Sequence, residues 1–554
     1  MAGNAAKSSV HRSVGIHALI DLCKEERQQG GKKDSKMKRR AILKSALLPA
    51  AAGFSGTFAS PGTHAAERHA DIVTDVLVIG GGFAGLTTAL TAARSGAKVV
   101  LLERRAYTGG DGLLSACIIA SAESIVHKTQ NFSGDASLEA YWRQIEAGLT
   151  DEPLSKVRDN SPMSPVYAGF MKHDPRVMKR SAEMSPEVPA LLASFGIEFL
   201  PINPGQPFLL PTKPGSMSTF VKTIGVELNK LGVEVHTGAR AVSLETEEDR
   251  TPGAPPNAVR VTGATAKIQE KTVRIAADAV VIASGGFIDN KDMMRRYKRV
   301  WADVPKGFSA VGEGVPDGHD GDGIRLGRLA GAAVEDMESM PKLFAAPRKG
   351  EKSASWLLFD TDTAYLVDKS GKRFCDEHAS RYTGCALACL RNQIDGAYVV
   401  FDEATFTGSN AARWRYADLL AAGGLVKGET IEAAAQKVGV DPNGLRQTLE
   451  AIAADAAAGR DSAFGRKDKL FRALKGPFYI SKPSYPVSFK TEGGLEVDPD
   501  FRVLRAADDS AIPGLYAAGA VCGSISTRLC DVIASGLIVG PEAAAFAASA
   551  KKAG

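Results

Sequence analysis

The feature that most constrains the fold is a glycine-rich turn between two apolar runs. Residues 75–79 read Asp-Val-Leu-Val-Ile, which is typical of a strand buried within a parallel sheet. The turn 80–85 follows, residues 86–95 have helical spacing, and residues 97–102 form a second apolar run that ends at Glu103. This order of strand, turn, helix and strand predicts an α/β fold with a Rossmann-like domain.

The turn contains Gly-x-Gly-x-x-Gly at Gly80, Gly82 and Gly85. Gly80 permits the sharp turn, Gly82 lets the backbone approach a pyrophosphate, and Gly85 lets the helix pack on the strand. The free N–H groups at the start of the helix would bind the phosphates. Glu103 is placed to accept hydrogen bonds from an adenosine ribose. These residues predict a dinucleotide site but do not separate NAD from FAD.

Three further glycine clusters distinguish an FAD site from an NAD site. Residues 108–111 read Thr-Gly-Gly-Asp after the second strand, residues 280–287 are an apolar run ending in paired glycines, and residues 512–520 are a turn followed by a small-residue strand. Glycine turns at three distant strand ends would converge along one extended ligand. A nicotinamide dinucleotide domain has no need of the last two, so the pattern favours FAD.

With these motifs the chain resembles the FAD-binding flavoprotein subunits of fumarate reductase and succinate dehydrogenase. Soluble fumarate reductases, L-aspartate oxidase and 3-ketosteroid dehydrogenases are related to them. The resemblance extends over residues 71–548 and includes three more motifs: Gly321-Asp322-Gly323, Thr491-Glu492-Gly493-Gly494 and Gly371-Lys372-Arg373-Phe374-Cys375-Asp376-Glu377. It implies an FAD-binding domain split into residues 67–334 and 489–554, with an inserted α+β capping domain at residues 335–488.

Patterns inside the inserted segment independently indicate a small α+β unit. Its residues suggest strands at 360–368 and 396–402 and helices at 430–437 and 442–458. Outside it, a Pro- and Gly-rich loop at residues 251–257 would join two strands of the FAD domain. Cys385 and Cys389 are one helical turn apart, and we expect them to be small buried thiols.

The resemblance implies a non-covalent FAD and no metal site. Succinate dehydrogenase flavoproteins carry a histidine soon after the Gly-Gly turn, whereas residues 111–121 contain none. His127 is the first histidine afterwards, and we expect it on the surface. The residues expected to contact FAD are Gly80, Gly82, Phe83, Ala84, Gly85, Glu103, Arg104, Gly109, Gly110, Asp111, Ser115, Ala116, Val242, Ser284, Gly285, Gly286, Asp322, Gly519, Ala520 and Leu537.

Two arginines are the candidates for chemistry. A reduced flavin can transfer hydride from N5 to the β-carbon of an unsaturated acid or ketone if the protein polarises the carbonyl and supplies a proton. The resemblance places a proton-donating arginine at Arg381 and a carboxylate-binding arginine at Arg528. A guanidinium fork suits the two oxygens of a carboxylate. Because arginine rarely loses its proton, Arg381 needs a partner that re-supplies it.

The chain also departs from the fumarate reductases. The family's carboxylate-binding histidines are missing at residues 339–342 and before Thr491, where Lys490 stands instead. Leu357 and Asp360 occupy the positions of the acid and the arginine of the family's proton path. Without these histidines the substrate pocket should be less polar, so we expect the substrate to be a larger, partly apolar unsaturated acid or enone rather than fumarate.

Three functions therefore stay open. The first is an ene-reductase or dehydrogenase of the fumarate reductase type, with Arg381 as acid and Arg528 as clamp. The second is a ketone desaturase like the 3-ketosteroid dehydrogenases, with Tyr382 and Lys490 near the carbonyl. The third is a flavin-bearing electron-transfer or assembly subunit without its own substrate. The sequence carries no haem or iron–sulfur motif, so an external electron partner is expected: a cytochrome, a quinone or a redox protein.

The start of the chain resembles an export signal. Lys38-Arg39-Arg40 precedes a short apolar stretch, so residues 37–65 are interpreted as a twin-arginine signal and residues 1–36 as an unstructured extension or a mis-assigned start. A periplasmic location follows. Residues 1–66 carry a net charge of +7 against +5 for the whole chain, so the remainder carries −2 and nucleic acid is not an expected partner. No other run reaches about 18 apolar residues, so no transmembrane span is expected.

Overall fold

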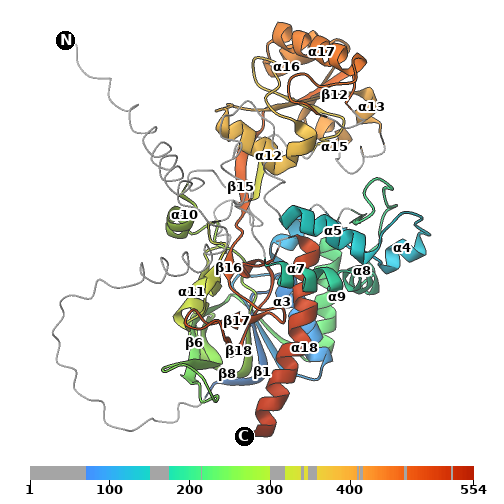
Figure 1. Cartoon of the computed structure of the whole chain (residues 1–554). Coiled ribbons are helices and arrows are strands. Elements are labelled where there is room, and N and C mark those ends of the chain that lie inside the picture. The colour runs from blue at the N-terminus through green and yellow to red at the C-terminus, as the bar shows by residue number, and fades with distance from the viewer. Residues whose placement is uncertain are drawn as a thin grey trace, which may run out of the picture. The chain divides into compact units, whose positions relative to one another are not determined.

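The computed structural model divides the chain into two units, Met1–Arg68 and His69–Gly554. It describes residues 70–115, 117–149, 174–213, 215–299, 318–338, 342–346, 359–408, 411, 416–466, 471–525 and 528–553 (Figure 1). The expected signal at residues 37–65 and the extension before it lie outside the described residues, and both stay predictions.

The largest element is an eight-stranded sheet with the order β17-β18-β8-β1-β2-β5, to which β7 and then β6 add from β8. The strands β18, β8, β1, β2 and β5 are parallel, whereas β17, β7 and β6 pair antiparallel with their neighbours. The second halves of the central strands, such as residues 76–79 of β1 and 279–282 of β8, are apolar because both faces are covered there. The strands are β1 (Ile72–Ile79), β2 (Val99–Glu103), β5 (Glu234–Thr237), β6 (Ala239–Glu248), β7 (Val259–Ile268), β8 (Lys271–Ile282), β17 (Arg502–Leu504) and β18 (Ala511–Ala517).

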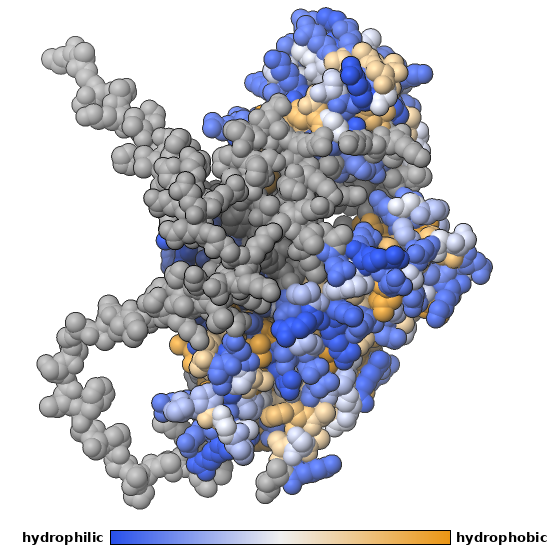
Figure 2. Space-filling model, viewed as in Figure 1, coloured by the Kyte–Doolittle hydropathy of each residue, from blue (hydrophilic) through white to orange (hydrophobic). Residues whose placement is uncertain are grey.

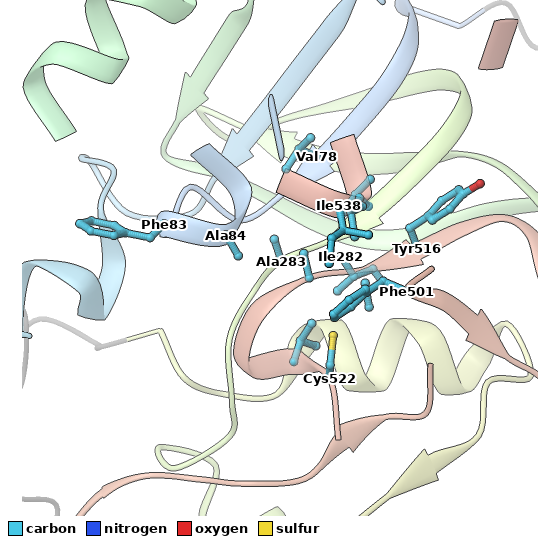
Figure 3. Close-up of a cluster of buried hydrophobic side chains, with 14 of the residues drawn as sticks. Val78, Phe83, Ala84, Ile282, Ala283, Phe501, Tyr516, Cys522 and Ile538 are labelled. Carbon is cyan, nitrogen blue, oxygen red and sulfur yellow. The ribbon is translucent and has the colours of Figure 1, made fainter. Parts of the chain in front are cut away.

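This sheet confirms the predicted α/β fold. The strand, helix and second strand expected from residues 75–102 are β1, α3 (Phe83–Arg94) and β2. The loop expected at residues 251–257 lies between β6 and β7. Side chains from distant elements meet in one core, as Val78, Ile282, Tyr516 and Ile538 do in Figure 3.

The C-terminal helix α18 (Leu529–Ala553) packs on α3 and on the sheet. Thr91 of α3 donates a hydrogen bond from Oγ1 to the carbonyl oxygen of Gly536 over 3.0 Å. Among the described residues, Leu529–Lys552 is the one segment long and apolar enough to cross a membrane, yet 61% of its most apolar window is buried inside the fold. Burial against α3 and β8 accounts for its apolar composition.

A mostly helical lobe precedes β5. Its helices are amphipathic, so the face in Figure 2 is mainly hydrophilic over α4, α5 and α8, while side chains such as Val177 and Leu192 are fully buried. The lobe contains β3 (Ile118–Ala120), α4 (Ile125–Thr129), α5 (Leu138–Leu149), α7 (Pro175–Met184), α8 (Glu187–Ser194), β4 (Leu209–Pro211) and α9 (Ser216–Lys230).

Several short elements lie outside the large sheet and the helical lobe. They are η1 (Gly110–Leu114), α10 (Lys291–Tyr297), α11 (Asp322–Leu329), β9 (Val334–Glu335), β10 (Lys342–Ala346), β15 (Tyr485–Lys490), β16 (Gly494–Leu495) and η4 (Gly519–Val521). The strand β16 pairs with β9, and β10 pairs with β15.

A second, antiparallel sheet has the order β11-β12-β14-β13 and two hydrophobic clusters of its own. All its strands fall inside the predicted cap, although the domain boundaries themselves stay a prediction. Cys385 and Cys389 are buried in one of these clusters, as expected. The elements are β11 (Tyr365–Val367), α12 (Glu377–Arg391), β12 (Tyr398–Asp402), α13 (Glu403–Phe406), α15 (Tyr416–Ala421), β13 (Leu425–Gly428), α16 (Ile431–Val438), α17 (Pro442–Ala457) and β14 (Phe478–Ser481).

The expected strand at residues 360–368 is too long. Only Tyr365–Val367 pair with β12, and residues 361–363 form a turn. The side chain of Asp360 causes this turn, because its Oδ1 accepts a hydrogen bond from the Asp362 backbone N–H over 3.0 Å. Aspartate commonly competes with strand pairing in this way.

Candidate cofactor-binding and active site

Four neighbouring parallel strands end at the same edge of the large sheet. Ile282 pairs with both Ile79 and Ala517, and Ile79 pairs with Leu102. The glycine turns that follow these strands therefore lie side by side, although they are up to hundreds of residues apart in sequence. Figure 3 shows Ala84, at the start of α3, near Ala283, in the turn after β8. The sheet thus brings the turns together at one edge, which is the arrangement that a single extended ligand requires.

In the glycine turn after β1, the backbone of one glycine, Gly82, is open to the approach of a ligand. Gly80 has φ +114°, and a Cβ added there would lie 2.4 Å from the carbonyl oxygen of Ala283. A Cβ on Gly85 would lie 1.8 Å from the carbonyl oxygen of Gly80, whereas a Cβ on Gly82 would meet nothing within 4 Å. Gly82 also begins α3 without any side-chain cap. An uncapped helix start with an open approach to its backbone fits a pyrophosphate.

Glu103 organises the neighbouring loop. Its Oε2 accepts a hydrogen bond from the Gly81 N–H over 2.8 Å, and its Oε1 accepts one from the Arg105 N–H over 2.7 Å. Each carboxylate oxygen has a second lone pair, so the ribose role expected for Glu103 is compatible with these bonds.

An ion-pair network lies beside Glu103. Arg104 pairs with Asp320, and Arg240 Nε is 2.6 Å from Asp322 Oδ2. The hydrogen bond from Arg240 to Asp322 raises the pKa of that arginine. Arg104 and Asp322, both expected at FAD, are thus brought together by the structure.

Val242, another expected contact, lies in an irregularity of β6. Ala241 pairs with Ala266 and Ser243 pairs with Thr265, so Val242 has no residue opposite it in β7. Its carbonyl oxygen accepts a hydrogen bond from Arg325 over 3.5 Å. Bulges of this kind turn backbone groups away from the ladder, which suits contact with an adenine ring.

The second turn places Asp111 next to Gly82. The Gly109 N–H donates to the carbonyl oxygen of Gly81 over 2.8 Å, and a Cβ on Gly110 would lie 3.2 Å from the Cα of Gly82. The Asp111 carboxylate Oδ2 is 2.9 Å from His319 Nε2.

The electrostatic surroundings of Asp111 keep it ionised. Burial raises the pKa of Asp111, but the charge and hydrogen bond of His319 and the charges of Arg105 and Lys490 outweigh burial, so its pKa is lowered. This interaction also brings Lys490 into the surroundings of Asp111. Sequence reasoning missed His319, although it stands two residues before the identified Gly321-Asp322-Gly323 motif.

The third turn is joined to the re-entering chain. Thr491 Oγ1 accepts a hydrogen bond from the Phe287 N–H over 3.0 Å, and a Cβ on Gly286 would lie 2.3 Å from the same oxygen. The Ser284 hydroxyl is buried and has no hydrogen-bond partner within the described part of the chain. A buried hydroxyl without a protein partner fits a polar ligand.

The fourth turn is η4, which contains Gly519 and Ala520. The Gly519 N–H donates to Ser535 Oγ over 2.9 Å and so ties η4 to α18. Leu537, on the same helix, is half-buried. Ser524 was missed by sequence reasoning: its hydroxyl is fully buried and finds no partner in the ranges that the structure covers. The residues present at these four turns therefore fit FAD.

Of the three remaining expected cofactor contacts, the structure describes two. Phe83 is buried edge-on against Phe220, with 5.3 Å between the ring centroids. Ser115 ends η1 and accepts a hydrogen bond from the Cys117 N–H over 3.3 Å. Ala116 lies outside the described residues.

Arg528 immediately precedes α18. Its Nε donates to Asp531 Oδ2 over 2.7 Å, and its guanidinium lies 5.9 Å from the centre of the Tyr141 ring. Burial lowers the pKa of Arg528, but Asp531 more than offsets it, so the pKa is raised and the arginine stays charged. The side chain keeps 37% of its surface exposed.

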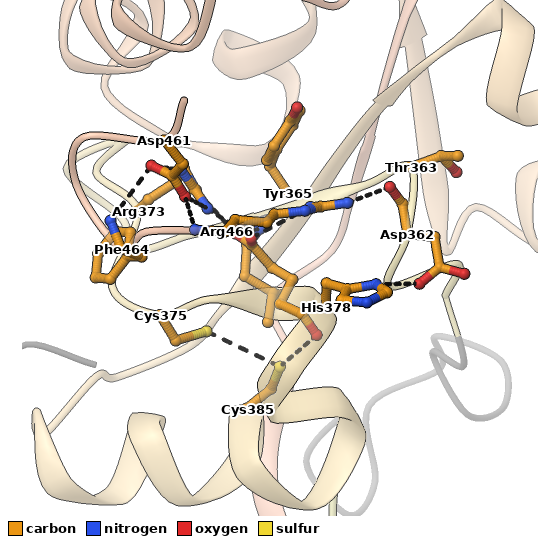
Figure 4. Close-up of polar contacts among 12 residues, drawn as sticks. Asp362, Thr363, Tyr365, Arg373, Cys375, His378, Cys385, Asp461, Phe464 and Arg466 are labelled. Carbon is orange, nitrogen blue, oxygen red and sulfur yellow. Dashed lines mark hydrogen bonds and ion pairs between the residues drawn. The ribbon is translucent and has the colours of Figure 1, made fainter. Parts of the chain in front are cut away.

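The cap motif forms a buried ion cluster at the start of α12 (Figure 4). Arg373 Nη2 is 2.8 Å from Glu377 Oε2 and 3.1 Å from Asp461 Oδ2, and Arg466 Nη1 is 3.6 Å from Glu377 Oε2. Burial lowers the pKa of Arg373, but Glu377 and Asp461 raise it more strongly. The motif therefore orients the first turn of α12.

The expected catalytic residues Arg381 and Tyr382 lie one turn further along α12, and their side chains are outside the described features. His378 lies on the same helix, three residues before Arg381 and four before Tyr382. Its Nδ1 is 2.7 Å from Asp362 Oδ1, and its side chain is 36% exposed (Figure 4).

The expected surface position of His127 is wrong. His127 is 6% exposed, its Nδ1 is 2.7 Å from Ser124 Oγ, and its Nε2 is 2.8 Å from the carbonyl oxygen of Pro207. The Ser124 contact belongs to the capping box at the start of α4. Local sequence could not reveal the second contact, because Pro207 is eighty residues away in the chain.

Comparison with known proteins identifies the family. The model of the FAD binding domain matches residues 206–532, which is more than half of the chain. The chain belongs to the FAD-binding domain family. A second model, FAD dependent oxidoreductase, matches residues 75–286. The cofactor is therefore FAD, and the second match relates the chain to FAD-dependent oxidoreductases.

Individual relatives are more distant. NADH:acrylate oxidoreductase of Vibrio harveyi is 26% identical, with 85% of this chain and 50% of the relative covered. A probable fumarate reductase of Shewanella frigidimarina is 25% identical, with 86% and 75% covered. This member of the family thus spans half the length of the first relative and three quarters of the second. The open conformation of a flavocytochrome c3 fumarate reductase has the same fold, with a TM-score of 0.63, 22% identity and coverage of 94% of this chain and 82% of that one.

Proposed function

We propose that this protein transfers a hydride between N5 of a non-covalently bound FAD and a C–C bond activated by a carboxylate or carbonyl. The observation that carries the proposal is the charged, partly exposed Arg528, fixed by Asp531 on the helix that η4 contacts. A guanidinium so placed can bind the activating carboxylate of a substrate beside the flavin site. Reductases of acrylate and fumarate among the relatives support this choice.

Bound FAD supplies the hydride acceptor or donor, and the side chains supply the rest. Arg528 binds the carboxylate and draws electron density from the double bond. Lys490, whose positive charge helps to lower the pKa of Asp111, is the second cation that could polarise the carbonyl of a substrate. Arg381 donates the proton to the carbon next to the activating group. His378, held by Asp362 one turn earlier on α12, returns a proton to Arg381 in place of the acid that the chain lacks at Leu357.

Non-covalent attachment of FAD follows from the histidines near the second turn. Residues 111–121 contain none. Both ring nitrogens of His127 are already engaged by Ser124 and Pro207. Denaturation should therefore release all of the flavin, which ultrafiltration followed by absorbance measures.

The substrate we propose is an unsaturated acid larger and less polar than fumarate, because Lys490 replaces a carboxylate-binding histidine. The electron partner is external: a cytochrome, a quinone or a redox protein. The sequence of residues 37–65, interpreted above as a twin-arginine signal, further supports export to the periplasm through that pathway. Turnover of fumarate as fast as that of any bulkier acid would exclude the substrate class. Failure of R39K/R40K to retain the precursor in the cytoplasm would exclude the export route.

The decisive experiment reduces the purified protein anaerobically and mixes it with unsaturated acids and enones while flavin absorbance is recorded. Reoxidation by acids should be lost in R528M and in R381Q. Arg176, an exposed arginine paired with Asp174, provides the control R176Q, which should react normally. Reoxidation by enones that survives in R381Q would support the ketone desaturase instead. Reoxidation by no acid or enone would leave an electron-transfer subunit.

A further inference from the structure

His319 lies between two carboxylates from different parts of the FAD site. Its Nε2 is 2.9 Å from Asp111 Oδ2, and its Nδ1 is 3.4 Å from Asp289 Oδ2. Asp111 is the second residue of η1, after β2, whereas Asp289 follows the turn after β8. The imidazole is 14% exposed. One partly buried histidine thus connects two of the turns that surround the cofactor.

The position of His319 relative to the cofactor follows from two glycines. A Cβ on Gly285 would lie 3.5 Å from His319 Cδ2, so the ring lies against the turn after β8. On the other side of the ring, Asp111 follows Gly110. A Cβ added to Gly110 would lie 3.2 Å from the Cα of Gly82. Gly82 is the glycine whose approach is open for the pyrophosphate. His319 and Asp111 are therefore at the edge of the phosphate-binding part of the site.

The charges around His319 favour its protonated form. Nε2 lies at hydrogen-bond distance from Asp111, and Nδ1 is close enough to Asp289 for charge attraction but not in hydrogen-bonding geometry, so the two carboxylate charges favour a proton on both nitrogens. Asp289 also accepts a hydrogen bond from the His319 backbone N–H over 3.2 Å. Arg105 and Lys490 are the other charged groups that act on Asp111. Without the imidazolium, the site would hold two carboxylates beside a ligand that is itself an anion.

We propose that protonated His319 closes the FAD site by linking Asp111 to Asp289 and balances the negative charge of Asp111 next to the pyrophosphate. Loss of this proton leaves Asp111 to repel the phosphates and frees the two turns from one another. FAD retention therefore becomes weaker as pH rises through the titration of His319. His319 is a positioning residue in this arrangement, and its role does not depend on the substrate.

The test measures the dissociation constant of FAD by fluorescence titration of the apoprotein between about pH 5.5 and 9, the range in which histidine titrates. In the wild type, affinity should fall across this range. H319Q should bind FAD about tenfold more weakly at low pH, as expected for one lost charge-assisted hydrogen bond, and should show little pH dependence. H236Q is the matched control, because His236 lies on the edge strand β5 with only a 3.7 Å contact to Glu234.

A double-mutant cycle separates charge balance from simple damage to the fold. If His319 acts through Asp111, D111N/H319Q should bind FAD more tightly than H319Q, because the unbalanced charge is gone. Thermal unfolding of each apoprotein reports folding independently of FAD. Wild-type affinity that is constant across the pH range would overturn the proposal whatever happens to the variants. Additive losses in D111N and H319Q would overturn it as well.

Discussion

Gly82 and Gly85 belong to the same motif, yet alanine should affect them in opposite ways. A Cβ on Gly85 would lie 1.8 Å from the carbonyl oxygen of Gly80, and backbone cannot yield cheaply. A Cβ on Gly82 meets nothing within 4 Å, and its φ of −71° and ψ of −178° suit any residue. G85A should therefore damage the fold, whereas G82A should damage only the binding of FAD.

The expected magnitudes follow from these contacts. Overpacking against backbone in G85A should cost about 3 kcal/mol of unfolding free energy. G82A should change the stability of the apoprotein by less than about 1 kcal/mol, because a weaker helix start offsets the lower entropy of the unfolded chain. The added methyl group would face the pyrophosphate, and overpacking of about 1–3 kcal/mol corresponds to an affinity loss of about 5-fold to 150-fold.

The assay compares thermal unfolding of the apoproteins with FAD affinity from fluorescence titration. G82A should unfold like the wild-type apoprotein and bind FAD poorly, and G85A should unfold at a clearly lower temperature before any FAD is added. Wild-type FAD affinity in G82A would refute the assignment of this open approach to the pyrophosphate. A wild-type unfolding temperature in G85A would refute the steric argument.

Three other perturbations test the surroundings of the site. E377Q removes a fully buried charge from Arg373 and should cost about 3–5 kcal/mol, measured as a lower midpoint of cap unfolding, whereas E450Q at an exposed pair should change little. T491V leaves the Phe287 N–H without its acceptor and should cost about 1–3 kcal/mol in thermal stability together with some FAD affinity. Lys298 is buried, and burial lowers its pKa to about 7 from 10.5, so the unfolded state binds more protons between these values. Unfolding free energy should rise with pH across that interval, by at most about 1.4 kcal/mol per pH unit, and K298M should abolish this slope in denaturant titrations.

Local patterns predicted the elements that local forces determine. The apolar run and the glycines of residues 75–103 correspond to β1, α3 and β2, because strand burial and helix packing follow directly from side-chain spacing. The helices expected at 430–437 and 442–458 are α16 and α17, each begun by a side-chain cap, Thr430 or Asp441. The strand at 360–368 failed where one polar side chain, Asp360, redirected the backbone.

The amino-acid sequence alone determined the fold class and the flavin cofactor, since the apolar runs and the glycine turn after each of them are visible in the sequence and parallel strands bring such turns to one edge of a sheet. Tertiary structure alone decided which charges meet. His319 faces Asp111 and Asp289, and His127 is buried against Pro207, only because parallel pairing and helix packing bring distant segments together. Electrostatic interactions depend on distance in space, and that distance is set by strand register rather than by separation along the chain.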